Sequence, residues 1–133
     1  MKSQTLAKKA VAVLHEKLAD DILLLDLRKR SPLADWFIIA TASSTVHAQA
    51  LAEDLRVALK ALGESPHHVE GVEYGQWVLL DYFDVVVHIL ISDVRQFYGL
   101  ERLWGDAPRQ TLSSNGDTEL RPDAAAPATG GAD

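Results

Sequence analysis

The sequence predicts an α/β (α+β) fold, in which a mixed sheet of about five strands is flanked by helices. Three observations support this prediction. Two long segments place apolar residues at helical spacing, and five short runs between and after them are rich in aliphatic, β-branched or aromatic residues. The 133 residues suffice for one domain, and a composition of 47% hydrophobic and 24% charged residues is typical of a soluble globular protein.

The N-terminal part predicts a helix followed by two strands. Apolar residues recur at helical spacing over residues 4–19, and Ser3 is the expected N-cap. Residues 22–27 form a short apolar run that is typical of a strand covered on both faces, and residues 35–41 form another. The polar, proline-containing segment between these runs predicts a turn.

The central part predicts a second helix and a short strand. The helix begins after Ser44 or Thr45, either of which can cap it, and carries an apolar stripe. Gly63 is the residue at which we expect the helix to end, because glycine favours the left-handed backbone of a helix C-terminus. Residues 67–70 predict a short strand.

The last part of the predicted domain contains a hairpin and a short helix. Residues 76–82 and 84–91 are two β-branched or aromatic runs in close succession, which predicts two paired strands. Their turn, around Tyr82 and Phe83, lacks the glycine that hairpin turns prefer. A helix that begins at Asp93 completes the order α-β-β-α-β-β-β-α.

The chain divides into a folded domain, residues 1–107, and a C-terminal tail, residues 108–133. The tail holds three of the five prolines and ends in a run of small residues with almost nothing large to bury. Such a composition predicts disorder, because burial cannot compensate the entropy of ordering the chain.

The net charge of −6 argues against a general nucleic-acid binder. Residues 31–107 carry four Lys or Arg against eleven Asp or Glu, so this segment suits a basic partner; the alternative is that the surplus acid only keeps the protein soluble. The absence of cysteine excludes disulfides and thiolate zinc sites and fits the cytosol. We find no targeting segment and no apolar run long enough for a bilayer, so we expect a cytoplasmic protein without membrane contact.

Two features are candidates for catalysis. The polar turn Thr41–Thr45 between a strand and a helix could hold phosphate, but it lacks a glycine-rich loop, and helix capping explains the same residues. Asp81 and Asp84 could bind a divalent ion, but they straddle the hairpin turn and share no strand face, so turn chemistry explains both.

The histidines offer no stronger case for a catalytic or metal site. His67 and His68 are adjacent on a strand and point to opposite faces, so only His68 and Glu70 can share a face, which gives two ligands. His47 lies near serines but lacks a visible acid to orient it. The residues therefore predict no catalytic set, no metal and no cofactor.

Trp77 and Tyr82 lie on the predicted hairpin and are candidates for an interface. Aromatic residues of this kind anchor protein contacts because they bury a large area at a small cost in entropy. Core packing is the alternative for each of them. Taken alone, the residues favour a binding module over an enzyme.

Several ordered blocks resemble the bacterial ribosomal silencing factor (Iojap-like) family. They run through residues 3–107, nearly the whole predicted domain. The blocks that carry the resemblance are Ala34-Asp-Trp-Phe-Ile-Ile-Ala-Thr-Ala-Ser-Ser44, His47-Ala-Gln-Ala-Leu51, Glu70-Gly71, Trp77-Val-Leu-Leu-Asp-Tyr82, Asp84-Val-Val-Val-His88 and Phe97-Tyr-Gly-Leu-Glu-Arg-Leu-Trp104-Gly-Asp106.

The resemblance implies a fold related to nucleotidyltransferases, without the catalytic carboxylates and without enzyme activity. It implies a translation repressor that binds the large ribosomal subunit through that subunit's protein number fourteen, a basic protein, and so blocks joining of the small subunit when nutrients or energy are short. The resemblance also implies a homodimer when the protein is free, because members of the family are often homodimers in that state. The alternatives from the residues are a nucleotide-binding protein or nucleotidyltransferase-type enzyme, and a simple dimerisation adaptor.

The resemblance also implies which residues face the partner. Trp77 would be the anchor, and the acidic side chains would pair with Lys or Arg of the partner. Phe83 departs from the glycine that many members have, which affects the shape of the turn. The residues transferred from the family are Trp77, Leu79, Asp81 and Tyr82, with Glu70 and Asp84 as weaker members.

Overall fold

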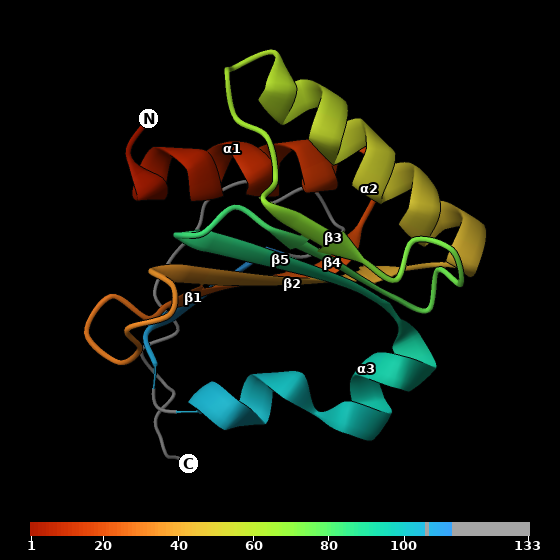
Figure 1. Cartoon of the computed structure of the whole chain (residues 1–133). Coiled ribbons are helices and arrows are strands. Elements are labelled where there is room, and N and C mark those ends of the chain that lie inside the picture. The colour runs from red at the N-terminus through yellow and green to blue at the C-terminus, as the bar shows by residue number, and fades with distance from the viewer. Residues whose placement is uncertain (106, 113–133) are drawn as a thin grey trace.

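The structure, a computed structural model, describes residues 1–105 and 107–112 and forms three layers. Two helices, α1 and α2, cover one face of a sheet, and a short helix, α3, lies with the 3-10 helix η1 on the other face (Figure 1). The helical elements are α1 (Ser3–Glu16), α2 (Thr45–Lys60), α3 (Ser92–Tyr98) and η1 (Leu100–Trp104). The strands are β1 (Asp20–Asp26), β2 (Trp36–Ala42), β3 (His68–Glu70), β4 (Trp77–Asp81), β5 (Val85–Ile91) and β6 (Arg109–Leu112).

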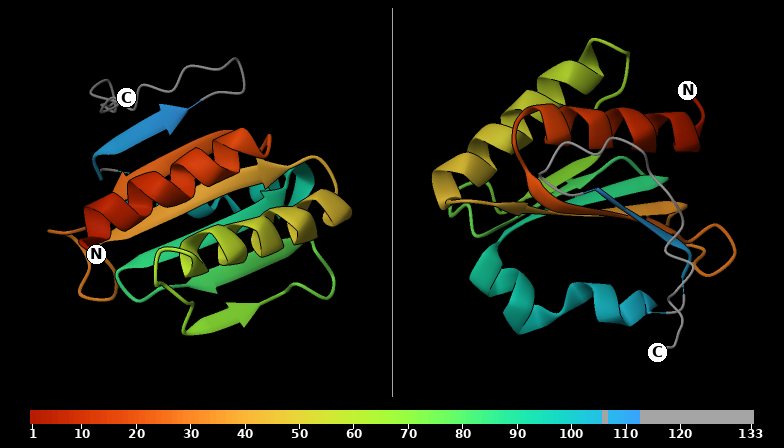
Figure 2. Two further views of the ribbon diagram at one scale, coloured as in Figure 1. Left: turned by 90° about the horizontal axis from the view of Figure 1, so that it is seen from above. Right: turned by 180° about the vertical axis from the view of Figure 1, so that it is seen from behind.

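The sheet has the order β3-β4-β5-β2-β1-β6 and is mixed, as the sequence predicts. Its central pair, β2 and β5, is parallel, and all other neighbouring strands are antiparallel. The parallel pair requires a crossover, which runs through α2 and β3–β4. Seen from above, α1 lies over β1 and β2, whereas α2 lies over β4 and β5 (Figure 2).

The sheet has six strands rather than about five, because β6 pairs with β1 at one edge. This strand lies in the segment that the sequence assigned to a disordered tail, so that assignment was wrong for residues 109–112. The physical reason is that β1 offers an apolar edge to which even a short, mixed-polarity segment can bond. Residues 113–133 of the predicted tail lie outside the described residues.

The main core lies between the sheet and the two long helices. Leu6 and Leu14 of α1 and Leu55 and Leu59 of α2 are buried against alternate residues of the central strands, such as Ile38. The stripes that predicted these helices are therefore their buried faces. A second, smaller cluster lies between the sheet and the segment of α3 and η1. Within residues 1–105 and 107–112, no helix is long and apolar enough to cross a membrane.

The two long helices begin differently. Ser44 caps α2 as predicted, because its hydroxyl accepts a hydrogen bond of 3.0 Å from the backbone N–H of His47. The expected N-cap of α1 was wrong: Ser3 is the first helical residue, and Lys2 occupies the cap position without a side-chain hydrogen bond.

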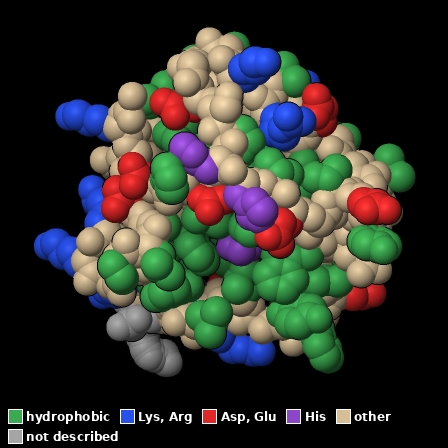
Figure 3. Space-filling view, in the orientation of Figure 1, with side chains coloured by type: hydrophobic (Ala, Val, Ile, Leu, Met, Phe, Trp, Pro, Cys, Tyr) green, Lys and Arg blue, Asp and Glu red, His purple; other side chains and the backbone are tan. Residues whose placement is uncertain are grey.

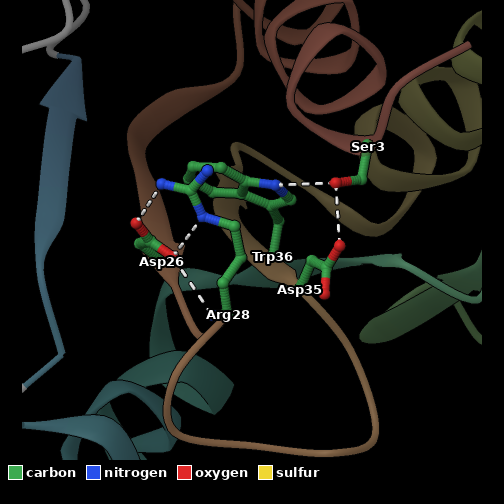
Figure 4. A network of polar contacts seen from close by, with 5 residues as sticks. All are labelled: Ser3, Asp26, Arg28, Asp35 and Trp36. Carbon is green, nitrogen blue, oxygen red and sulfur yellow. Dashed lines mark hydrogen bonds and ion pairs between the residues drawn. The ribbon is translucent and has the colours of Figure 1, made fainter.

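Ser3 instead ties α1 to the start of β2. Its hydroxyl donates to Asp35 (2.9 Å) and accepts from the indole N–H of Trp36 (3.2 Å), as Figure 4 shows. The Arg28 guanidinium lies 4.7 Å from the centre of the same indole and is held there by two hydrogen bonds to Asp26. These contacts lower the pKa of the Asp26 carboxyl, mainly through the hydrogen bond from Arg28.

Candidate functional site

The face of the sheet opposite α1 and α2 is only partly covered. The apolar cluster under α3 and η1 takes in Trp77 from β4 but not Leu79 or Asp81, which follow it on the same face of that strand. Figure 3, which views the β3 edge, shows hydrophobic side chains below that edge and histidine and acidic side chains near the middle. We call the partly covered set the open face, and its members are Glu70, Trp77, Leu79, Asp81 and Val86.

The register of the strands brings these side chains together. Glu70 on β3 lies opposite Leu79 on β4, and Asp81 on β4 lies opposite Val86 on β5. Trp77, Leu79, Asp81 and Val86 are each half-buried, and Glu70 is exposed. The result is an apolar strip bordered by carboxylates, which suits a protein surface that offers Lys or Arg around an apolar centre.

Trp77 is held in place by neighbours on two elements. Its indole N–H donates a hydrogen bond of 3.0 Å to Nδ1 of His88 on β5. Its ring lies 5.1 Å from the ring of Tyr98 at the end of α3, and the His88 ring lies 5.1 Å from that of Phe37. An indole fixed in this way loses little further entropy on binding, which is the property of an interface anchor.

His88 is neutral and serves Trp77 as an acceptor. Burial lowers its pKa from 6.5 to about 4, because the charged imidazolium would lose its hydration. Since Nδ1 accepts the indole hydrogen, the ring proton resides on Nε2, which has no hydrogen-bond partner among the described residues. The sequence contains no local pattern that indicates the pairing of His88 with Trp77.

Sequence reasoning missed two exposed aromatic residues beside the open face. Phe97 and Tyr98 end α3 and are 78% and 56% exposed, and their rings pack edge to face at 5.0 Å. Leu103 of η1 is exposed as well. The available signal was the Phe-Tyr pair directly before Gly99, whose left-handed backbone (φ 55°) ends the helix and leaves both rings at its end.

The acidic residues of the candidate set divide into two kinds. Glu70 is exposed and contacts the ring of His68, its neighbour on the same strand face. Asp81 Oδ1 accepts a 2.8 Å hydrogen bond from the backbone N–H of Phe83, so it has the turn role that the sequence suggested. Asp84 is exposed in the β4–β5 turn, just beyond the open face.

Tyr82 does not belong to the open face, and its placement there was wrong. It follows Asp81 and points to the opposite side, where it is 5% exposed within the core under the long helices. Burial raises the pKa of its phenol to about 12. The physical reason is strand alternation: Tyr82 is an odd number of residues from Trp77, so the two rings face opposite ways.

The polar turn Thr41–Thr45 lines a pocket of about 530 Å³ at the ends of β2 and β5. The Ser44 hydroxyl is engaged in capping α2. Asp20, Asp21 and Asp93 also line the pocket, and their charges oppose a phosphate there. The turn is therefore occupied by structural hydrogen bonds and bordered by carboxylates.

His47 has a structural role in the same region. Its Nδ1 accepts from the backbone N–H of Ser43 at 2.9 Å, so its Nε2–H donates to the Lys17 carbonyl at 3.1 Å. The partner of Nε2 is a backbone carbonyl. In a catalytic triad a carboxylate orients the histidine, so the contacts of His47 are not those of a triad histidine. In the part of the chain that the structure describes, no group of three or more His, Asp or Glu could hold a metal ion.

Comparison with known proteins decides the family. Residues 1–132 match the family described as "Ribosomal silencing factor during starvation". The chain belongs to this family. It is 40% identical over 112 residues to the ribosomal silencing factor of Bacillus subtilis, which covers 84% of this chain and 95% of the relative.

Two further relatives extend the comparison to a solved structure and to a mitochondrial protein. A crystal structure of a Chromobacterium violaceum protein is similar with a TM-score of 0.77 and 40% identity, covering 79% of this chain and 88% of that one. A mouse relative, named mitochondrial assembly of ribosomal large subunit protein 1, is 29% identical over 97 residues, which are 71% of this chain and 42% of the relative. The family resemblance inferred from the sequence and the mixed α/β fold are thus confirmed.

Proposed function

We propose that this protein represses translation by binding the large ribosomal subunit and blocking the joining of the small subunit when nutrients or energy are short. Membership of the ribosomal silencing factor family is the observation that carries the proposal. The name of the mouse relative, which refers to the ribosomal large subunit, supports the choice of subunit. The mechanism is steric, needs neither a cofactor nor catalysis, and operates in the cytoplasm.

The proposed contact is between the open face and protein number fourteen of the large subunit. Trp77 would enter an apolar depression of the partner, with Leu79 beside it. Glu70 and Asp81 would pair with Lys or Arg of the basic partner, and Asp84 would add charge from the turn. Tyr82 is left out of the proposed contact, because its side chain lies in the opposite core.

We further propose that the free protein is a homodimer. The exposed Phe97, Tyr98 and Leu103 form an apolar surface that two copies could bury against each other. Because Tyr98 contacts Trp77, such a dimer would reach the open face, and binding to the ribosome would compete with it.

A subunit-joining assay tests the proposed function. Purified large and small subunits are mixed with and without an excess of the protein, and the fraction of joined ribosomes is measured by sedimentation. We expect the protein to travel with the large subunit and the joined fraction to fall. If subunits join equally well in the presence of excess protein, the proposed mechanism is wrong.

Trp77→Ala tests the proposed anchor in the same assay. Loss of a central aromatic anchor should weaken binding to large subunits by about 2 kcal/mol, roughly thirtyfold. Tyr74→Ala is the matched control, because Tyr74 is 77% exposed in the loop between β3 and β4, outside the open face. Circular dichroism of both variants confirms folding, and equal affinities of the two folded variants would place the contact elsewhere.

A further inference from the structure

A second pocket lies at the β3 edge of the sheet, on the side of α2, and the open face lies across that edge. It has a volume of about 340 Å³ and lies between α2 and β3. Arg56 and Lys60 of α2 line it, as do His68 of β3 and His67, the residue before that strand. None of its lining residues is acidic. We call it the α2–β3 pocket.

The positive lining of this pocket is unusual for the chain around it. Residues 31–107 contain four Lys or Arg in all, and two of them, Arg56 and Lys60, line the α2–β3 pocket. A third, Arg95, is engaged with Thr41 and Glu101. The fourth, Arg102, lies in η1. Half of the positive charges of the acidic segment therefore lie in this one pocket.

Helix geometry places the two basic side chains on one side of α2. Arg56 and Lys60 are four residues apart, so they lie one above the other. Like charges at this spacing repel each other and destabilise a helix, and a bound anion would remove that repulsion. Arg56 has one surface ion pair, to Glu53 (2.9 Å), and Lys60 has no ion-pair partner among the described residues.

The hairpin turn positions the histidine wall of the pocket. The His67 ring packs on the Phe83 ring at a centroid distance of 3.7 Å, and its backbone N–H donates to the Asp81 carbonyl (2.8 Å). Phe83 has a left-handed backbone (φ 73°), a conformation that costs a bulky residue energy. The phenyl group at this strained position gives His67 a platform that glycine would not provide.

We propose that the α2–β3 pocket binds a phosphate group of the ribosomal RNA backbone when the open face is docked on the large subunit. The inference rests on the proposed function, because it uses the docked orientation to choose RNA as the source of the phosphate. The Arg56 guanidinium and the Lys60 ammonium provide the donors that phosphate groups require, and the imidazole of His67 can add an N–H group. The His68 ring contacts Glu70 on the open face and is not part of the proposed donor set. The acidic open face then contacts basic protein while the basic pocket contacts RNA.

The first experiment examines the pocket without ribosomes. The ring signals of His67 and His68 are followed by NMR at constant pH while inorganic phosphate or a single-stranded RNA decamer is added to the full chain. We expect both probes to shift the signals of His67 more than those of His68, whose ring contacts Glu70 on the open face, and to leave those of His47 unchanged. Arg56→Gln/Lys60→Gln should remove the response. If neither probe shifts the His67 signals, the site does not exist, and a response to inorganic phosphate alone overturns RNA as the ligand.

The second experiment measures binding to purified large subunits at two salt concentrations. One phosphate contact should make the salt dependence steeper by about 0.7 in log–log slope, so raising salt fourfold should cost the wild type about 2.6-fold more affinity than Arg56→Gln/Lys60→Gln. Lys8→Gln/Lys9→Gln removes the same charge from exposed positions of α1 and is the control, which should keep the wild-type slope.

The outcomes separate the two proposals. Equal salt slopes for all three proteins, or equal losses in both double variants, overturn the phosphate contact while leaving ribosome binding intact. If the wild type fails to bind large subunits, the proposed function is wrong, and ribosomal RNA is then not the source of the phosphate group. The NMR response then decides by itself whether the pocket is an anion site.

Discussion

The two faces of the sheet use aromatic residues in opposite ways. Under the long helices, Trp36 and Tyr82 are 2% and 5% exposed and belong to the main core. On the other face, Trp77 is half-buried and leads to the exposed Tyr98 and Phe97. One strand, β4, contributes to both faces, which shows how a single apolar run can stabilise the fold and form a contact surface at once.

The largest expected difference between the faces concerns two adjacent leucines of β4. Leu80 is fully buried under the helices, so Leu80→Ala should lower the free energy of unfolding by about 2–5 kcal/mol. Leu79→Ala, on the open face, should cost about 1 kcal/mol or less and weaken binding to large subunits instead. Urea unfolding measures the first effect and co-sedimentation the second. Equal losses of stability would mean that the two faces do not differ as described.

His88 gives the open face a pH dependence of its own. Its pKa is about 4 in the folded protein against 6.5 ordinarily, so between these values the unfolded chain binds a proton that the folded chain does not. The free energy of unfolding should therefore fall as the pH falls from about 6.5 to 4, by about 3 kcal/mol from this group.

Urea unfolding of the wild type and His88→Gln at pH 7 and pH 4.5 measures that contribution. Glutamine can still accept from the Trp77 indole, but it does not titrate, so the variant should lose less stability than the wild type on acidification. Parallel losses in the two proteins would show that His88 is not the titrating group.

The smallest expected effect comes from the helix-covered face. The Tyr82 hydroxyl is buried and has no hydrogen-bond partner within the part of the chain that the structure describes. Tyr82→Phe should therefore change the free energy of unfolding by about 1 kcal/mol or less, toward greater stability, and leave large-subunit binding unchanged. Weaker binding of this variant would place the phenol in the contact after all.

Much of the fold could be predicted from the sequence, because its strongest patterns come from the strands and helices that build the main core. The apolar run 22–27 predicts a strand and the apolar stripe after Ser44 predicts a helix, and both elements appear in the structure. The strand Arg109–Leu112 could not be found in this way. It is short and mixed in polarity, and it is defined by the edge of β1, which lies more than 80 residues away in the sequence.

The candidate site was predicted less completely, for two physical reasons. Strand alternation, counted from Trp77, separates Leu79 and Asp81 from Tyr82. Both sides of β4 are apolar, however, so the sequence does not show which side the long helices cover. The Trp77–His88 hydrogen bond and the contact with Tyr98 depend on the packing of α3 against the sheet, which no local pattern encodes.

The sixth strand has a consequence for how the molecule avoids self-aggregation. Residues 22–25 in the middle of β1 are all aliphatic, and on the side away from β2 their backbone N–H and C=O groups bond to β6. Without β6, the backbone groups on that side of β1 would be unpaired, and an apolar edge of this kind can pair with strands of other molecules. β6 is four residues long, is mixed in polarity and begins with an arginine, so the edge that it forms is a poor template for further strands. The start of the C-terminal segment therefore protects the sheet against edge-to-edge aggregation.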